Sequence, residues 1–333
     1  MRRRRCNPPA ALLLRAVAVL LLLPAAVHAQ AEPAGALELA MPFGARAVGM
    51  GKAVVADRSG IDAVWWNPAG IAELPRRELA LQYRQQGEFY RIVGVTYALP
   101  RAPIGTFAVS ASMVDYGSES ALDRDNVETG TFAHRFVVGT ATFGTTIGRR
   151  VTAGVNFRVF QNRFDCSGDC GAALQSSSGI APAVDAGVQF QPSDSVPLRF
   201  GLSIRHLGPR FQQNDAPQSD PLPSRIHLGA SYERPLGGPA SDPALRETRV
   251  RMSLEAVHLP VLEETALNAG AELSVQQRFF VRAGYTNEAG SSGASIGVGI
   301  VSGRLQIDLA RLTGASLEAI GGSPTLLTLR LGL

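Results

Sequence analysis

The chain has 333 residues, with 32 Lys or Arg against 28 Asp or Glu and a formal net charge of +4. Five of the arginines and none of the acidic residues fall within residues 1–29, so the remainder has 27 basic against 28 acidic residues, a net charge of −1. A balance so close to zero excludes the concentrated positive charge that nucleic-acid-binding proteins use. The sequence also predicts no cofactor and no metal site.

The first 29 residues are predicted to be a signal peptide. Arg2–Arg5 supply a positive start, residues 10–27 are apolar, and Val27-His28-Ala29 precede a predicted cleavage site before Gln30. This order is that of a bacterial Sec signal, and the apolar run is too short to span a membrane as a helix. We therefore expect export from the cytoplasm.

The next segment, residues 30–75, combines glycines with a tryptophan pair and an Asn-Pro step. Glycine relaxes the backbone where a chain turns or packs closely, and proline pushes the residue before it out of the helical region. The pattern predicts a short helix or turn ended by Asn67-Pro68, with the tryptophans packed against surrounding structure. An ordinary Gly-rich terminal segment is the alternative. The residues of this motif are Gly44, Gly49, Gly51, Trp65, Trp66, Asn67 and Pro68.

Residues 76–333 contain short segments in which apolar and polar residues alternate. In 249–256, for example, Val250, Met252 and Leu254 alternate with arginine, serine and glutamate. Strict alternation predicts a strand with one dry and one wet face, and lengths of about 9–11 residues are typical of strands that cross a membrane. Fourteen such segments are predicted, near residues 77–84, 89–99, 104–116, 131–144, 149–163, 180–190, 198–207, 224–234, 248–259, 265–275, 278–286, 294–301, 304–312 and 325–333.

The connections between these segments favour a membrane barrel over a soluble β-sandwich, which would also show alternation. Every second connection is short, as at 100–103 and 276–277, whereas 117–130, 164–179 and 208–223 are long. An even number of strands with alternating short turns and long loops is typical of bacterial outer-membrane barrels. The connection 235–247 is the exception, because it is long on the short side. The predicted fold is an all-β, transmembrane antiparallel barrel of about 14 strands with a small N-terminal plug.

Successive residues of a strand face opposite sides of the barrel wall, and this odd or even position, or parity, assigns several charged residues to the inner face. An arginine on the lipid face near mid-membrane costs about 2–4 kcal/mol, so these residues should line the lumen. Their mixed signs predict a paired network that holds the plug, not an open ion-selective pore. They are Arg158, Arg199, Arg205, Glu233, Arg249, Arg251, Glu255, Glu272, Arg282, Asp308 and Arg330.

Two cysteines and four histidines remain after the leader. Cys166 and Cys170 lie in a predicted outer loop, where an oxidising compartment favours a local disulfide; a metal site would need further ligands. The histidines are predicted to lie in the wall or at its rims, because the nearby serine and acidic residues face opposite sides of a strand. No catalytic motif occurs, so we do not expect an enzyme.

The glycine and Asn-Pro stretch resembles the N-terminal segment of PorV/PorQ-type outer-membrane proteins, relatives of the FadL-like transporters. The segments at 184–209, 222–233, 249–260 and 267–287 extend the resemblance over most of the chain. Lys52 departs from it by standing where glycine is usual, and the terminal Leu333 replaces the usual aromatic residue.

The resemblance implies a plugged barrel in the bacterial outer membrane, in contact with its lipid. It implies action as a binding scaffold in protein secretion or surface export, with secreted proteins or components of the type IX secretion system as partners. The alternative is FadL-like passage of hydrophobic small molecules across the outer membrane.

Overall fold

The computed structural model describes residues 34–87, 90–171, 175–213, 219–237, 242–288, 292–314 and 322–333, all within the compact unit Glu32–Leu333. The predicted signal peptide lies outside the described residues. None of the helices in the described ranges is long and apolar enough to cross a membrane.

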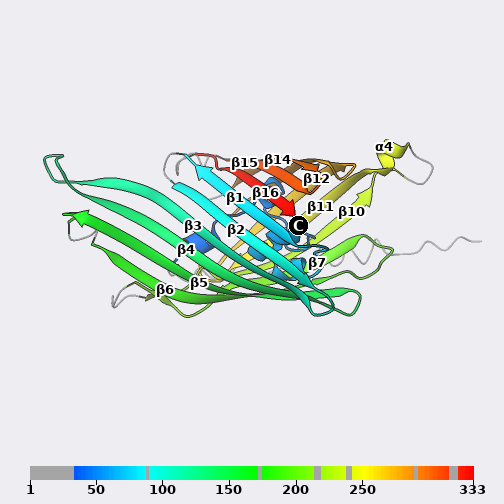
Figure 1. Cartoon of the computed structure of the whole chain (residues 1–333), viewed down its shortest axis with the longest axis horizontal. Helices are drawn as coiled ribbons and strands as arrows, with labels where there is room; N and C mark the ends of the chain where they lie inside the picture. The colour runs from blue at the N-terminus through cyan, green and yellow to red at the C-terminus, as the bar shows by residue number, and fades with distance from the viewer. Residues whose placement is uncertain are drawn as a thin grey trace, which may run out of the picture. The chain divides into compact units, whose positions relative to one another are not determined.

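Fourteen antiparallel strands close into a barrel, which confirms the predicted fold class (Figure 1). Each strand pairs with its neighbour in the barrel, and β1 closes the ring by pairing with both β2 and β16. Closure removes the free edges that an open sheet would expose. The strands are β1 (Glu78–Gln86), β2 (Tyr90–Arg101), β3 (Gly105–Leu122), β4 (Glu128–Ile147), β5 (Val151–Gly168), β6 (Ser177–Phe190), β7 (Leu198–Leu207), β10 (Arg225–Pro235), β11 (Thr248–Leu259), β12 (Glu264–Val275), β13 (Phe279–Thr286), β14 (Gly293–Ser302), β15 (Leu305–Thr313) and β16 (Thr325–Gly332).

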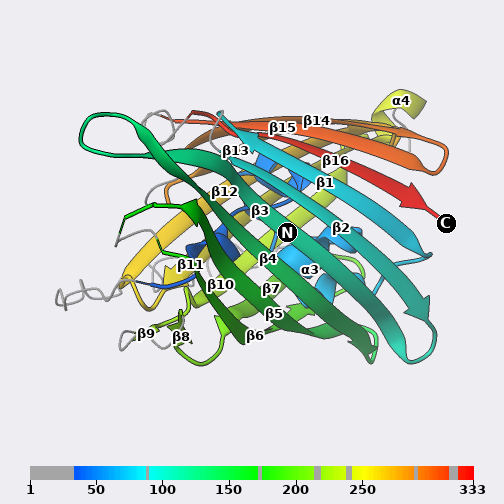
Figure 2. The same ribbon diagram turned by 60° about the vertical axis from the view of Figure 1, so that its left-hand side comes forward.

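Strands β3, β4 and β5 are longer than predicted and β6 begins earlier, so more than half of the expected loop 117–130 and half of the expected loop 164–179 are strand. The β3–β4 ladder continues past a bulge from Ser118↔Ala133 to Leu122↔Glu128, and Figure 2 shows this hairpin extending beyond its neighbours. Sequence alternation fails there because residues such as Ser118 and Ser120 are polar and both faces are wet. Backbone pairing needs no apolar face, so it continues where the pattern ends.

The two ends of the barrel differ in their connections. We call the end that carries the β3–β4, β5–β6 and β7–β10 connections the long-loop rim, and the end with the β2–β3, β12–β13 and β14–β15 turns the short-turn rim. At the long-loop rim, β8 (Phe211–Gln212) pairs with β9 (Ser219–Asp220). At the short-turn rim, the exceptional connection 235–247 contains α4 (Pro243–Arg246).

The outer face of the wall is apolar and exposed, and the inner face is covered. Leu254 is 68% exposed, whereas the adjacent Ser253 is 4% exposed and lies in the interior. Exposed large apolar residues on other strands include Val109, Phe157, Leu267, Val281 and Ile296. This band is the surface that a membrane-spanning barrel presents to lipid.

We predict that Leu254→Arg reduces the fraction of protein that folds into lipid vesicles, because it places a charge in the middle of the apolar band at a cost of about 2–4 kcal/mol. Val250→Arg, on the same strand and face but nearer the rim, should cost about 1 kcal/mol or less. The folded fraction is read from the faster gel migration of unheated barrel. Equal losses for the two variants would contradict a lipid-facing band.

Candidate functional site in the barrel interior

Residues 34–75, here called the inner segment, run through the barrel. Near its start, the Gly35 amide donates a hydrogen bond to the Pro221 carbonyl at the long-loop rim (2.9 Å). It leads into β1 at the short-turn rim. Its regular pieces are short, because glycines and Pro68 interrupt them: η1 (Leu37–Ala40), α2 (Ala45–Gly49), η2 (Gly60–Asp62), α3 (Ala63–Trp66) and η3 (Pro68–Ile71).

The backbone of the inner segment rests directly on glycines of the wall. An added Cβ at Gly284 would lie 2.1 Å from the Gly51 nitrogen, and one at Gly270 would lie 2.2 Å from the Met50 oxygen. Such distances are far below van der Waals contact, so no side chain fits at these positions without displacement. The other wall glycines with an added Cβ under 2.5 Å from the inner segment are Gly94, Gly154, Gly187 and Gly201.

The role of these wall glycines was not predicted, although the sequence contains a signal for it. Each occupies an inward parity position in a strand, where glycine otherwise weakens pairing and adds no packing. A glycine inside a strand marks a bulge or a close approach by another backbone. Their recurrence on separate strands could therefore have indicated a backbone lying against the wall.

The glycines of the predicted plug motif have local roles. Gly44 and Gly51 have φ angles of 86° and 62°, a region that L-residues rarely adopt. Gly49 lies against the wall, and an added Cβ there would be 3.1 Å from the Gly297 Cα. Lys52 also has a positive φ of 67°, which gives a physical reason why glycine is usual at this position in the resembled family.

The Trp-Trp-Asn-Pro step organises the middle of the inner segment. Trp65 packs on Phe43 with ring centroids 4.5 Å apart, and Trp66 Nε1 donates to the Phe43 carbonyl (2.9 Å). Asn67 follows α3 and caps η3: its Oδ1 accepts from the Ala69 amide (3.1 Å) and its Nδ2 donates to the Val55 carbonyl (2.7 Å). The single amide thereby joins two turns of the segment.

Ion pairs join α2 to the wall on the β11–β16 side. Arg46 contacts Asp57 within the inner segment (2.8 Å) and Glu272 of β12 (3.3 Å). Glu272 also pairs with Arg282 (2.6 Å) and Arg251 (2.8 Å). Buried charges are tolerated only when they are paired and hydrogen-bonded, and here each has at least one partner.

The network continues to the last strands. Arg282 bridges Glu272 and Asp308 (2.7 Å), and Asp308 binds Arg330 of β16 (2.7 Å). Arg330 then lies 3.8 Å from Asp62 of the inner segment, closing the chain of charges back onto it. The same inner segment is thus held at two points, Arg46 and Asp62.

A second polar cluster lies on the β5–β7 side. Arg158 pairs with Asp185 (2.7 Å) and donates to the Val64 carbonyl (3.0 Å). Arg205 lies with its guanidinium 5.6 Å from the Trp66 ring centre. It is 7% exposed and forms no ion pair with a described carboxylate, and the tryptophan face is one of the contacts that stabilise its charge.

Two carboxylates contact the inner segment near Val55 and Lys52: Glu255 of β11, and Glu288 in the connection that follows β13. Glu255 accepts from the Val55 amide (2.9 Å) and lies 2.7 Å from His227 Nδ1. Glu288 pairs with Lys52 (2.8 Å) and with Arg225. Burial alone would raise the pKa of Glu288, but the Lys52 ammonium and the Arg225 guanidinium lower it to about 2.

Every charged residue that parity assigned to the lumen lies on the inward side of its strand. Those in the middle of the barrel are buried, whereas Glu233 and Arg249 are partly exposed at the short-turn rim. Parity predicted which face of the strand each charged residue occupies, but not its ion-pair partner. The partners lie on other strands or on the inner segment, far away in the sequence.

A small, mainly apolar cavity of about 30 Å³ lies between the inner segment and the wall, towards the long-loop rim. Above it, Tyr116, His134 and Phe164 stack at 4.5 and 4.0 Å, and the Tyr116 hydroxyl donates to Glu38 (3.3 Å). Two arginines reach its deep end. The cavity is lined by Glu38, Leu39, Met41, Phe43, Trp65, Ile92, Ser112, Val114, Phe136, Val138, Arg158 and Arg205.

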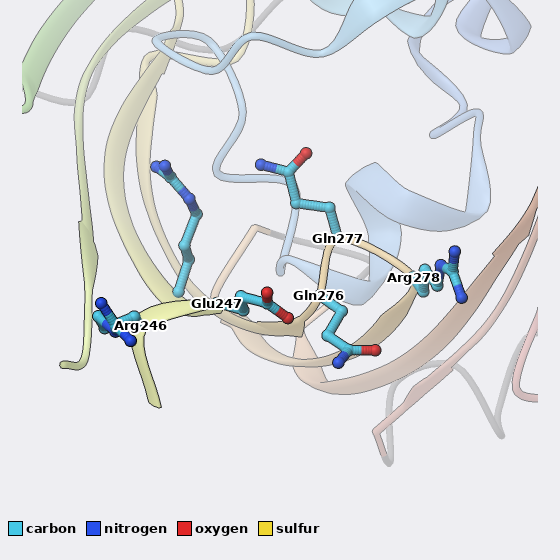
Figure 3. A pocket seen from close by; sticks show the side chains of 6 residues that line it. Arg246, Glu247, Gln276, Gln277 and Arg278 are labelled. Atoms are coloured by element: carbon cyan, nitrogen blue, oxygen red, sulfur yellow. The ribbon is translucent and has the colours of Figure 1, made fainter. Parts of the chain in front are cut away.

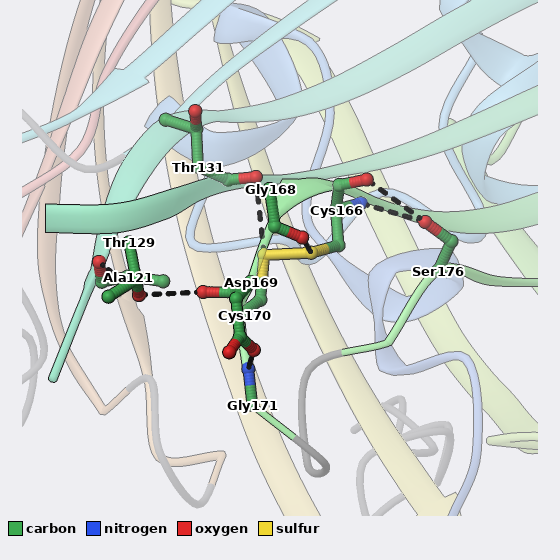
Figure 4. The surroundings of a disulfide bond; sticks show 9 residues. All are labelled: Ala121, Thr129, Thr131, Cys166, Gly168, Asp169, Cys170, Gly171 and Ser176. Atoms are coloured by element: carbon green, nitrogen blue, oxygen red, sulfur yellow. Dashed lines mark hydrogen bonds between the residues drawn. A yellow bond between two sulfur atoms is a disulfide. The ribbon is translucent and has the colours of Figure 1, made fainter.

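Cys166 and Cys170 are joined by a disulfide at the long-loop rim (Figure 4). Cys166 lies within β5 and not in a loop as predicted, because β5 continues to Gly168. Beside the disulfide, the Asp169 carbonyl accepts from Thr129 Oγ1 (2.7 Å) and the Asp169 amide donates to the Thr129 carbonyl (3.0 Å). The crosslink therefore holds the connection against the β5 end, and the Thr129–Asp169 hydrogen bonds join both to the start of β4.

The histidines occupy wall and rim positions. His206 and His227 are buried in the interior, His134 is in the aromatic stack, and His258 lies 3.1 Å from Thr265 Oγ1 on the outer side. Within the described ranges, no three His, Cys, Asp or Glu side chains are grouped to hold a metal ion.

No protein-family model matches the chain, and no curated protein matches it. Similar solved structures include the toluene transporters TbuX of Ralstonia pickettii and TodX of Pseudomonas putida. Both are 11% identical and cover 87% of this chain and 98% of theirs, with TM-scores of 0.57 and 0.58. The monoaromatic hydrocarbon channel CymD has a TM-score of 0.56 at 10% identity, covering 90% of this chain and 99% of its own.

At these identities the likeness shows the fold alone. The chain has the barrel fold of these toluene transporters and of this monoaromatic hydrocarbon channel, over nearly the whole length of those proteins. The fold that the resemblance implied is therefore supported, whereas nothing in the comparisons supports the PorV/PorQ group. The similar proteins are transporters and channels, and not enzymes, by their descriptions.

We predict that Gly284→Ala destabilises the protein by about 1–3 kcal/mol, because its Cβ would press on the Gly51 nitrogen. Gly139→Ala is the matched control, since its Cβ would have its nearest neighbour, the Val159 oxygen, at 4.0 Å. The temperature at which the unheated gel band is lost measures the difference. A Gly284→Ala barrel as stable as the control would mean that the inner segment does not rest on this strand.

Asp57→Leu should destabilise the protein by about 3–5 kcal/mol, because it leaves the buried Arg46 with Glu272 alone. Adding Arg46→Met should recover part of this loss by removing the charge that has lost one of its two carboxylate partners, while Glu272 keeps Arg251 and Arg282. The same thermal assay compares the single and double variants. A double variant that loses the sum of the two single effects would show that the pair is not coupled.

Proposed function

We propose that this protein passes hydrophobic small molecules across the bacterial outer membrane, after Sec-dependent export. The observation that carries the proposal is the apolar cavity between the inner segment and the wall, in a barrel with the fold of monoaromatic hydrocarbon transporters. In this proposal residues 30–75 are a plug, residues 76–333 are the barrel, and residues 1–29 are the removed signal peptide.

The position of the cavity supports entry from the long-loop side. Most of its lining residues are hydrophobic or aromatic, with Glu38, Arg158 and Arg205 as the charged exceptions, and a mainly apolar lining favours apolar ligands. It adjoins Val114, one residue before the β3–β4 register shift between Asp115 and Ser118. A ladder is locally disrupted at a bulge, so this is a place where the wall can open with little loss of backbone pairing.

The cavity as it stands is a closed state. At about 30 Å³ it has room for one or two water molecules, whereas an apolar cavity of roughly 150 Å³ binds benzene. Passage therefore requires the inner segment to move. Leu39 and Met41 lie in its first turns, ahead of Arg46, and their displacement would enlarge the cavity without breaking the Arg46 ion pairs.

The charged interior supports the plug role. The pairs from Arg46, Lys52 and Asp62 to the wall fix the middle of the inner segment, and the wall glycines bring its backbone into contact. Such a filled lumen hinders free diffusion of ions. Movement confined to the first turns would let an apolar molecule pass while this seal remains.

Service in protein secretion, the function first implied by sequence resemblance, has no specific observation in its favour. The extended β3–β4 hairpin and the disulfide-tied β5 end would be available to a partner at the cell surface, but similar extensions also suit a transporter. We therefore place hydrophobic transport first.

The test is uptake of labelled toluene into vesicles containing the purified barrel. Val114→Trp should lower uptake severalfold, because it fills the cavity, and Phe43→Ala should raise it. Val109→Trp is the control, since Val109 lies on the outward face of the same strand. Equal uptake by Val114→Trp and Val109→Trp, with both barrels folded, would contradict a route through this cavity.

A further inference from the structure

The mouth of the barrel at the short-turn rim has a polar cavity that passage of hydrophobic molecules does not use. Its volume is about 490 Å³. Figure 3 shows labelled side chains from the end of the connection 235–247 and from the β12–β13 turn around it. The lining residues are Arg246, Glu247, Arg249, Gln276, Gln277 and Arg278, three of them arginines.

Backbone contacts hold the two sides of this cavity together. Gln276 and Gln277 both have φ near 53°, as a tight two-residue hairpin turn of the mirror-image type requires. The Gln276 amide donates to the Glu247 carbonyl (3.1 Å), which fixes the end of the long connection against the turn. The cavity is thus preformed by the one connection that is unexpectedly long at this rim.

The cavity opens along the barrel axis and not towards lipid. Arg249 shares the inward parity of Arg251, and Arg278 shares that of Arg282. The neighbouring Phe279 faces outward and is exposed in the apolar band. A lipid headgroup beside the wall would meet the outward residues, whereas a soluble molecule approaching the mouth would meet the arginines.

A second cavity of about 150 Å³ continues from Arg249 towards the inner segment. It adds Arg58 and Arg199, which share the carboxylate of Glu73 at 3.1 and 2.9 Å. Two guanidinium groups on one carboxylate leave an excess of positive charge. Arg278 forms no ion pair with a described carboxylate, so the mouth as a whole is positive.

The surrounding rim exposes more arginines than carboxylates, the latter including Asp194 and Asp242. Exposed arginines stand in or beside its turns and at the chain end, and their fields add to that of the mouth. They are Arg76, Arg77, Arg101, Arg149, Arg150, Arg234 and Arg304. The long-loop rim instead exposes many carboxylates, including Glu119, Asp123, Asp125, Glu128, Asp169 and Glu263.

We propose that the short-turn mouth is a docking site for a soluble protein that presents an acidic segment. Arginine forms paired hydrogen bonds with carboxylates, and a mainly positive rim steers a negatively charged partner to the mouth. The partner's carboxylates bind Arg246 and Arg278 at the cavity edge, and Gln276 and Gln277 donate further hydrogen bonds. This assignment goes beyond the proposed transport and does not depend on the nature of the transported molecule.

The test uses the full-length barrel in discs of uncharged lipid and a fluorescent glutamate oligomer as the probe. Fluorescence anisotropy should show binding that weakens with added salt, because the contacts are exposed. Arg246→Gln with Arg278→Gln should weaken it roughly tenfold, as expected for the loss of two exposed charge contacts. Arg124→Gln with Arg163→Gln, an equal charge change at the long-loop rim, should leave it unchanged.

Three outcomes would overturn the proposal. The oligomer could bind the two double variants equally, a lysine oligomer could bind as tightly as the glutamate one, or the mouth variant could lose affinity for anionic lipid discs and not for the peptide. The last result would make lipid headgroups the occupant. Faster gel migration of both unheated variants verifies folding, and because no hydrocarbon is present, the result is independent of the uptake assay.

Discussion

The arrangement of the interior depends on direct contact between the backbone of the inner segment and glycines of the wall. At Gly201, Gly270 and Gly284 there is no room for even one methyl group. This contact brings polar backbone groups of an irregular segment close enough to hydrogen-bond with wall side chains. Irregular backbone at membrane depth is tolerated only when such partners are present.

The ion pairs of the interior depend on the same close approach of the inner segment to the wall. The side chains that fill the lumen are mainly apolar on one side of the barrel and mainly charged on the other. Phe43, Trp65 and Ile71 pack towards β2–β6, whereas Arg46 and Asp62 face the acidic and basic residues of β11–β16. Burying so many charges brings little net stability, because desolvation opposes pairing. Their contribution is to give the inner segment one position, since any shift would leave a charge unpaired.

This division suggests how a plugged barrel can both seal and transport. The ionic half is costly to disrupt and holds the segment in place, while the apolar half consists of contacts that can be exchanged for those of an apolar solute. The small cavity lies on the exchangeable side, beside the aromatic stack of Tyr116, His134 and Phe164. The cationic mouth lies at the opposite rim, where the described lining is polar and gives no apolar binding surface.

The sequence by itself determined the number of strands, their order and the inward or outward side of each residue. A period of two is imposed by the strand backbone, and burial of one face is visible in composition without knowledge of any partner. The sequence did not predict the ends of β3, β4 and β5. Their polar extensions lie beyond the apolar band and pair through backbone groups, which carry no sequence signal.

Only the tertiary structure decided what the interior does. Parity assigned Glu272 to the lumen, but its pairing with Arg46 arises because residues more than two hundred positions apart meet when the barrel closes around the inner segment. The roles of Gly284, of the cavity beside Val114 and of the arginines at the mouth have the same origin. Each depends on distances across a closed wall, which a one-dimensional pattern does not contain.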